Sequence, residues 1–416
     1  MKRRTFLLST SLAGLGPSIF LNRIFKRSPK MENQTTTEQI KPLAFTMWDF
    51  SWLERRWSGA GYEDWDKALA ELVDRGYNAV RIDAYPHLIA NGKNKKWKLM
   101  PVWSVLDWGS PMTIQVRIQP SLNEFIAKCR DHKVKVGLST WYREDVDNVR
   151  MKIASPDIMA DQWIKTIESI DEEGLLDNVF YVDLCNEWPG DLWAPYFKNN
   201  PPELTWGGWY TTNSMAWMAK AVEKVKKAFP DLPAGISFEI KKLNELQKQD
   251  VSFVDYLEPH IWMSQRNDNE FYRKMKFQDD TFSFKGFETM VAKGFDLYNS
   301  DKSYWQSLLT NYIKELGMLA GELNQPCMTS ECWAVVNYKD LPGLDWGWIK
   351  ELCALGAITA ADTGQWLAVS TSNFCGPQFT GMWRDIEWHQ KLTNHIRTAK
   401  VNDDLLDSKL VKRMQL

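Results

Sequence analysis

The sequence lacks the short motifs that carry chemistry in several enzyme classes. It has no HExxH zinc motif, no GxSxG nucleophile elbow and no GxxxxGK phosphate loop. Its five histidines and six cysteines show no metal-ligand or CxxC spacing, so we predict no metal site and no cofactor. A formal net charge of −2 with mixed signs gives no electrostatic basis for binding nucleic acid. After residue 30, no apolar run is long enough to cross a bilayer.

Aromatic side chains are abundant, above all 22 tryptophans and 13 tyrosines among 416 residues. Indole faces stack on the C–H surfaces of sugars and on cations, so this excess is typical of a carbohydrate-binding cleft. The alternative is that bulky residues fill a large core. For any single tryptophan, the composition leaves both interpretations open.

The first 30 residues are typical of an export signal. Arg3 and Arg4 precede an apolar run from Phe6 to Leu21, a pattern that resembles the twin-arginine export motif. We therefore predict an exported protein, periplasmic or extracellular, and an ordinary secretory signal or a retained membrane anchor is the alternative. Residues 31–41 are polar and threonine-rich, which predicts a linker.

The rest of the chain alternates apolar runs of strand length with segments of helical periodicity. Eight such pairs predict an α/β fold, a single (β/α)8 TIM barrel over residues 42–402, followed by a tail at 403–416. Long loops after the second, fourth and sixth strands are expected over the C-terminal face. The expected strands are residues 43–52, 79–85, 134–142, 179–188, 234–239, 253–262, 326–333 and 365–371.

Two of the expected strands end in a glutamate. The run Val179–Trp188 (VFYVDLCNEW) contains Asn186 and Glu187, and Pro326–Trp333 (PCMTSECW) contains Glu331. Parallel barrels carry their chemistry at the carboxyl ends of strands, so the two glutamates are expected to face each other across the mouth. Such a pair suits glycoside hydrolysis, in which one carboxyl protonates the leaving oxygen and the other attacks or activates water.

The order of the strand-end residues resembles that of clan A glycoside hydrolases, and it is most similar to the cellulase-like family 5 group. The resemblance covers about residues 42–400. It implies a retaining mechanism with Glu187 as acid/base and Glu331 as nucleophile. It also implies four supporting residues: Arg81 to orient the nucleophile, Asn186 beside the acid, His260 in the sixth strand, and Trp366 as a platform under the reacting sugar.

The sequence departs from the family 5 pattern in the sixth strand. Trp262 stands two residues after His260, where the family usually has a tyrosine. Because an indole cannot offer that hydroxyl to the nucleophile, Tyr142 or Tyr338 is expected to substitute for it. The remaining substrate contacts that we predict are Trp48 and Asp49 at the end of the first strand, Trp262 itself, and Trp333, which with Trp188 would form apolar walls beside the glutamates.

Several of these residues also have a purely structural interpretation. Arg81 could form an ion pair with Asp49 or Asp83, and His260 could be a satisfied core histidine. With a catalytic pair, the chain is a retaining glycoside hydrolase that cleaves a β-linked glycan or glycoside by double displacement. Its partner is then a carbohydrate substrate. The alternatives are a non-catalytic carbohydrate-binding barrel, and an isomerase or lyase that would need a metal or a phosphate loop.

Overall fold

Parallel strands form a closed ring in the computed structural model, which describes residues 40–198, 208–239, 242–277 and 283–415. One sheet runs in the order β10-β12-β1-β2-β5-β6-β7, and a second in the order β11-β9-β8. A parallel bridge from Leu257 to Cys327 joins the two sheets on one side. The strands are β1 (Leu43–Asp49), β2 (Ala79–Asp83), β5 (Lys135–Ser139), β6 (Val179–Asp183), β7 (Ala234–Gly235), β8 (Phe238–Glu239), β9 (Pro259–Trp262), β10 (Cys327–Thr329), β11 (Cys332–Trp333) and β12 (Trp366–Ser370).

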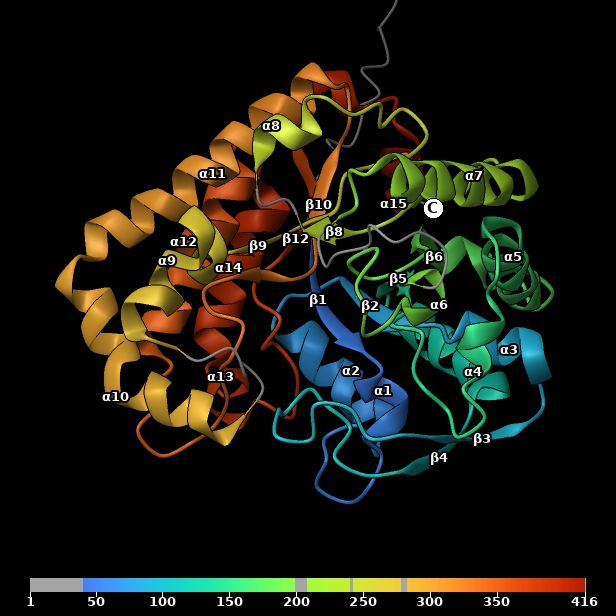
Figure 1. The fold of residues 1–416 in the computed structure, drawn as a ribbon, viewed down its shortest axis with the longest axis horizontal. Coiled ribbons are helices and arrows are strands. Elements are labelled where there is room, and N and C mark those ends of the chain that lie inside the picture. The colour runs from blue at the N-terminus through green and yellow to red at the C-terminus, as the bar shows by residue number, and fades with distance from the viewer. Residues whose placement is uncertain (1–39, 199–207, 240–241, 278–282, 416) are drawn as a thin grey trace, which may run out of the picture. The chain divides into compact units, whose positions relative to one another are not determined.

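The fifth and seventh strand positions are each split, into β7 and β8 and into β10 and β11. With these pairs counted once, the described residues form eight strand positions, and each is followed by a helix that packs outside the ring (Figure 1). This confirms the predicted (β/α)8 barrel. The outer helices are α2 (Trp65–Asp74), α4 (Ile118–Asp131), α5 (Pro156–Asp171), α7 (Thr212–Ala228), α8 (Leu243–Leu246), α11 (Lys302–Glu322), α12 (Gly347–Asp362) and α14 (Ile386–Thr398).

Side-chain caps begin several of these helices where the sequence places a short polar residue. Ser155 accepts a hydrogen bond from the Ile158 N–H ahead of α5, and Pro156 occupies the first helical position. Thr211 caps α7 in the same way. These local signals fix where the chain turns back along the barrel.

The segments above the barrel hold more regular structure than the sequence predicts. Residues 87–119, expected as a loop, contain an antiparallel hairpin of β3 (Lys96–Leu99) and β4 (Ile114–Arg117). Residues 263–302, also expected as a loop, contain helical segments. The further helices are α1 (Ser51–Glu54), α3 (Pro86–Gly92), α6 (Pro195–Lys198), α9 (Arg266–Met275), α10 (Phe284–Ser300), α13 (Thr380–Trp383) and α15 (Lys409–Gln415).

Aromatic side chains fill the lower part of the barrel. Phe45, Tyr181 and Tyr256 lie in one buried cluster inside the ring. Gly137 leaves room for this layer, because a Cβ there would lie 2.0 Å from Cε1 of Tyr181. The C-terminal residues continue the cluster, since Leu410 of α15 is fully buried in it. The barrel is therefore closed below, and its polar residues gather at the C-terminal ends of the strands.

The expected export signal at residues 1–30 and most of the expected linker at 31–41 lie outside the described residues. No helix in the part of the chain that the structure describes is long and apolar enough to cross a membrane.

Candidate active site

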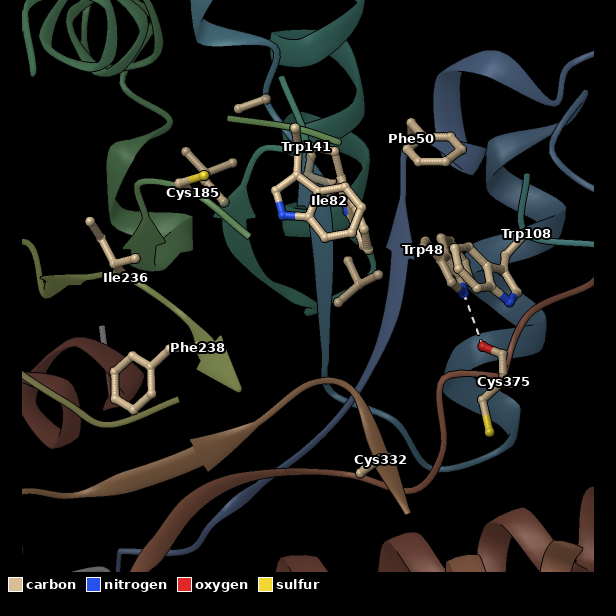
Figure 2. Packing of buried hydrophobic residues seen from close by; sticks show 14 of the residues in the cluster. Trp48, Phe50, Ile82, Trp108, Trp141, Cys185, Ile236, Phe238, Cys332 and Cys375 are labelled. Atoms are coloured by element: carbon tan, nitrogen blue, oxygen red, sulfur yellow. Dashed lines mark hydrogen bonds between the residues drawn. The ribbon is translucent and has the colours of Figure 1, made fainter. Parts of the chain in front are cut away.

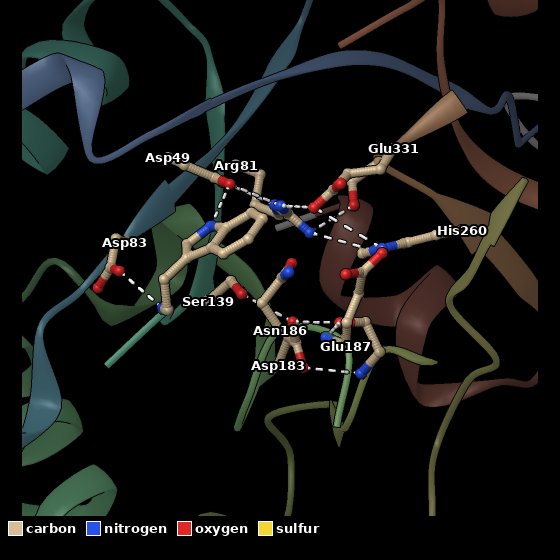
Figure 3. Close-up of polar contacts among 12 residues, drawn as sticks. Asp49, Arg81, Asp83, Ser139, Asp183, Asn186, Glu187, His260 and Glu331 are labelled. Carbon is tan, nitrogen blue, oxygen red and sulfur yellow. Dashed lines mark hydrogen bonds and ion pairs between the residues drawn. The ribbon is translucent and has the colours of Figure 1, made fainter. Parts of the chain in front are cut away.

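The two predicted glutamates lie on opposite sides of one histidine. Glu187 follows β6, Glu331 lies between β10 and β11, and His260 points between them from β9 (Figure 3). His260 Nδ1 lies 2.9 Å from Glu187 Oε1 and 3.7 Å from Glu331 Oε1. Each of the three residues offers an atom within 4.8 Å of the other two. The sequence prediction that these carboxyls meet at the barrel mouth therefore agrees with the structure.

Hydrogen-bond partners assign the tautomer of His260. Arg81 Nη1 lies 3.5 Å from His260 Nε2, and a guanidinium can only donate, so Nε2 accepts. The ring proton is then on Nδ1, which donates to Glu187. Burial, together with the positive charge of Arg81, lowers the pKa of His260, while the charge of Glu331 opposes this shift. A neutral imidazole with its proton directed at the acid results.

Arg81 holds Glu331 from the second strand. Its Nη2 donates to Glu331 Oε1 at 2.8 Å, and its Nε and Nη2 donate to the two carboxylate oxygens of Asp49 at 2.8 and 2.7 Å. A guanidinium bound on two edges by carboxylates has little freedom to rotate, which fixes the orientation of Glu331. Asp49 is thus an ion-pair partner of Arg81, as the structural interpretation allowed, rather than an evident sugar contact.

Trp141 extends this network outward. It follows β5, and its indole Nε1 donates to Asp49 Oδ2, the oxygen that also accepts from Arg81. The indole is buried, and it packs against other aromatic rings. Sequence analysis did not select Trp141 as a site residue. Its place at the end of the expected third strand, residues 134–142, was the available signal.

Glu258 is a third glutamate beneath the pair, on the segment that leads into β9. It is fully buried, accepts a hydrogen bond from Ser330 Oγ, and lies 3.5 Å from Arg81 Nη1. Burial raises its pKa to about 8, and the charge of Asp183 adds to this, while Arg81 opposes it. Glu258 is therefore mostly protonated at neutral pH and adds little negative charge below Glu331.

This carboxyl predicts a pH dependence of stability. Its pKa in the folded protein is above the ordinary value of 4.5, so from about pH 4.5 to 8 the unfolded chain releases a proton that the folded chain keeps. The contribution of Glu258 to the free energy of unfolding is full below this window and is lost as pH rises through it. We expect the loss to be on the order of 1–4 kcal/mol.

Glu258→Gln tests the prediction, because glutamine is a permanent analogue of the protonated acid and keeps an acceptor for Ser330. Thermal unfolding followed by circular dichroism at pH 5, 6.5 and 8 should show a smaller fall in Tm for this variant than for the wild type. Glu322→Gln, on the exposed end of α11, is the control and should follow the wild type. Parallel curves for all three proteins would show that Glu258 is not the titrating group.

The backbone at Glu187 is held by a separate set of hydrogen bonds. Glu187 has φ of +44°, an uncommon conformation for a residue with a side chain. Its N–H donates to Ser237 Oγ at 3.0 Å, and that hydroxyl donates to Asp183 Oδ2 at 2.9 Å. Ser139 donates to the same Asp183 oxygen at 2.7 Å. Strands on both sides of β6 thus fix the direction of the Glu187 side chain.

Asn186 and Trp262 also lie where the site needs them. Asn186 is fully buried, and neither polar atom of its side-chain amide has a partner among the described residues. Such an orphaned amide beside a carboxyl pair is suited to a ligand hydroxyl. Trp262 shares with His260 the face of β9 that points into the barrel, one step nearer the mouth. Both residues remain predicted substrate contacts.

Three predicted tryptophan contacts are wrong. Trp48 precedes Asp49 and so points to the other side of β1, where its Nε1 donates to the Cys375 carbonyl (Figure 2). Trp333 points to the outer helices, with its ring against Gly356 of α12. Trp366 begins β12 at the lower end of the barrel and packs against Gly317 of α11. All three are buried outside the ring.

The expected replacements for the missing tyrosine are also wrong, as is one expected wall. The hydroxyl of Tyr142 donates to the Leu184 carbonyl, and that of Tyr338 to the Asp345 carbonyl. Neither hydroxyl has a hydrogen bond to Glu331, whose carboxylate lies against Arg81 and His260. Trp188 lies under the outer helix α7, with its ring centroid 5.9 Å from that of Trp217.

Glu187, His260 and Glu331 are close enough to share one metal ion. Two features of the site oppose this use. The Nδ1 atom that would bind the ion carries the ring proton, and Arg81 already supplies a positive charge in contact with Glu331. The arrangement therefore fits proton transfer between carboxyls better than it fits a bound cation.

Comparisons with other proteins agree with this geometry. A family model described as sugar-binding cellulase-like matches residues 45–397. A crystal structure from Parabacteroides distasonis ATCC 8503, provisionally described as a glycoside hydrolase, is 50% identical with a TM-score of 0.88, covering 90% of this chain and 100% of that one. No curated protein matches the chain.

More distant structures share the fold alone. An endo-β-1,4-mannanase from Thermotoga petrophila is 10% identical with a TM-score of 0.50, covering 87% of this chain and 78% of that one. A GH5_18 protein from Bifidobacterium longum subsp. longum ATCC 55813 is 11% identical with a TM-score of 0.52, covering 87% and 81%. Both are consistent with the barrel built from the strand pairings.

Proposed function

This chain belongs to the sugar-binding cellulase-like family, and from that premise we propose that it is a retaining glycoside hydrolase acting on a β-linked glycan or glycoside. The observation that carries the proposal is the spacing of Glu187 and Glu331, whose nearest carboxylate oxygens lie within 4.8 Å. Retaining enzymes hold their two carboxyls about 5 Å apart, whereas inverting enzymes leave about 6.5–9.5 Å for a water molecule.

The contacts of each glutamate assign its role. Glu331 accepts a hydrogen bond from Arg81, which stabilises the carboxylate form that a nucleophile needs. Burial raises the pKa of Glu331 to about 7, Glu187 and Asp49 add to the shift, and His260 and Arg81 oppose it. The two carboxyls therefore share one proton near neutral pH. Because Arg81 forms an ion pair with Glu331, which favours its carboxylate form, we assign that proton to Glu187.

The reaction then proceeds in two displacements. Glu331 attacks the anomeric carbon as Glu187 donates its proton to the departing oxygen, and a glycosyl-enzyme forms. Glu187, now ionised, takes a proton from water, which attacks the same carbon from the opposite side and releases Glu331. His260 donates to Glu187 and supports the ionised state between the two steps. The buried amide of Asn186 is placed to bind the sugar's 2-hydroxyl.

Hydrolysis with stereochemical analysis tests the proposal. Purified protein is incubated with a panel of aryl β-glycosides and β-linked oligosaccharides, and NMR records the first-formed anomer. We expect release of the β-anomer before mutarotation. First release of the α-anomer would contradict the retaining mechanism. Binding of sugars without turnover across the panel would favour the alternative, a carbohydrate-binding barrel.

We also propose, from the twin-arginine-like start alone, that the protein is exported to the periplasm or beyond the cell. Fractionation of cells that express the full chain tests this, because export predicts that the protein leaves the cytoplasmic fraction. Replacement of Arg3 and Arg4 by lysine should then retain it there.

A further inference from the structure

A cavity lies beside the catalytic pair, on the same face of the barrel. It has a volume of about 400 Å³ and is lined by residues that follow β3, β5 and β6. Ligand pockets commonly start near 300 Å³, so this space is large enough for a small ligand. None of the predicted site residues lines it.

Three indoles form one side of this cavity. The ring centroids of Trp141 and Trp193 are 4.7 Å apart at 77°, and those of Trp103 and Trp141 are 4.9 Å apart at 81°. Rings packed edge to face present surfaces at right angles to one another, which makes an apolar corner. Trp103 is the most exposed of the three.

Charged side chains also line the cavity, namely Arg143, Glu144, Arg150 and Asp191, and both arginines are already paired. Arg143 donates to both carboxylate oxygens of Glu54 at 2.9 Å, and Arg150 donates to Glu144 at 2.7 Å. The two guanidinium charges are thus neutralised, so the cavity has no surplus positive charge for an anionic ligand. Arg143 Nη1 has no partner among the described residues and is not sealed from solvent, which leaves it as a donor to a ligand hydroxyl.

The cavity is connected to both catalytic glutamates. Trp141 donates to Asp49, which holds Arg81 and, through it, Glu331. Trp193 Nε1 donates to the Glu187 carbonyl at 3.4 Å, so the loop that begins at the acid forms the cavity's wall. An occupant would therefore lie next to the reacting sugar and not on it.

We propose that this cavity is a subsite for a neutral sugar unit of the substrate, adjacent to the one that reacts. An apolar corner together with hydrogen-bonding groups, and with no unpaired arginine, matches a neutral pyranose, with its C–H face and its hydroxyls. The inference rests on the proposed function. It predicts that the protein acts on oligosaccharides better than on short substrates, and that the cavity supplies the difference.

The test measures kcat/KM for di- and tetrasaccharides of β-1,4-linked glucose and of β-1,4-linked mannose. Trp103→Ala removes the most exposed indole, and Leu192→Arg, on the half-exposed rim, places a bulky charge across the entrance without disturbing the core. Both variants should lower the tetrasaccharide-to-disaccharide ratio of kcat/KM roughly ten-fold. Trp388→Ala is the control, because this partly buried tryptophan lies on the outer helix α14. An unchanged ratio in both cavity variants overturns the proposal.

Calorimetric binding separates this inference from the proposed function. If the wild type hydrolyses none of these sugars, the hydrolase proposal fails for them, and the titration of cellotetraose and mannotetraose then decides on the cavity. Tetrasaccharide binding that weakens roughly ten-fold in Trp103→Ala and Leu192→Arg supports the subsite. Equal binding by wild type and variants, or no binding by the wild type, overturns it.

Discussion

Replacing Glu331 with alanine should lower kcat/KM for an aryl β-glycoside by about 10⁴-fold or more, because it removes the group that forms the glycosyl-enzyme. The fold should survive the change. Arg81, which loses one partner, keeps both of its hydrogen bonds to Asp49.

Rescue by azide tests whether the role lost in Glu331→Ala is that of the nucleophile. In Glu331→Ala the cavity left by the carboxylate admits a small anion, which attacks the anomeric carbon directly while Glu187 still protonates the leaving group. One displacement inverts the centre, so we expect azide to restore turnover and to give the α-glycosyl azide, identified by NMR. Glu322→Gln serves as the activity control, and a β-glycosyl azide from Glu331→Ala would exchange the roles of the two glutamates.

The sequence was sufficient to predict the strands of the barrel and the two strand ends at which Glu187 and Glu331 lie. Glu187 and Glu331 end mostly apolar runs of strand length, and a closed parallel ring brings such ends to one face. Arg81 and His260 were predicted from the resemblance to family 5, and in the structure they lie on β2 and β9. Local pattern is informative here because the barrel repeats one geometric rule eight times among the described residues.

The tryptophans show what local pattern leaves undetermined. Trp48 and Asp49 were both expected at the sugar, yet consecutive residues of a strand face opposite sides, so only one of them could point into the barrel. Asp49 is the one that points inward, because it lies four residues after Phe45, which packs inside the ring and so sets the facing of the strand. The prediction for Trp366 was wrong for a different reason. Trp366 begins β12 at the lower end, where the expected strand of residues 365–371 already placed it, and its role as a platform came only from the family resemblance.

The groups that support the glutamates were also missed, because they come from separate strands. Glu258 and Ser330 meet beneath Arg81, although they are 72 residues apart. Ser237 and Asp183 meet beneath the Glu187 backbone, 54 residues apart. Serine carries no distinctive signal in a single sequence. Only the closed ring shows that Ser330 connects Arg81 to Glu258, and that Ser237 connects the Glu187 backbone to Asp183.

Glu187→Ala should produce a loss that depends on the leaving group, and this separates an acid/base from a nucleophile. A poor leaving group needs the proton that Glu187 supplies, so kcat/KM for an alkyl or oligosaccharide β-glycoside should fall roughly 10²- to 10⁴-fold. A dinitrophenyl leaving group needs none, so its kcat/KM should stay near the wild-type value.

The second step is then rate-limiting in Glu187→Ala, because no base activates the water. The dinitrophenyl substrate should show a burst of one equivalent of dinitrophenol per active site, followed by slow turnover. Azide needs no base, so it should accelerate that turnover and, after two displacements, give the β-glycosyl azide. This is the opposite anomer from the one expected of Glu331→Ala.

Equal losses for both leaving groups, with no burst, would contradict an acid/base role for Glu187 even if the protein is a glycosidase. The assignment of roles would then have to shift to another proton donor at the mouth, for which His260, in contact with both glutamates, is the nearest candidate.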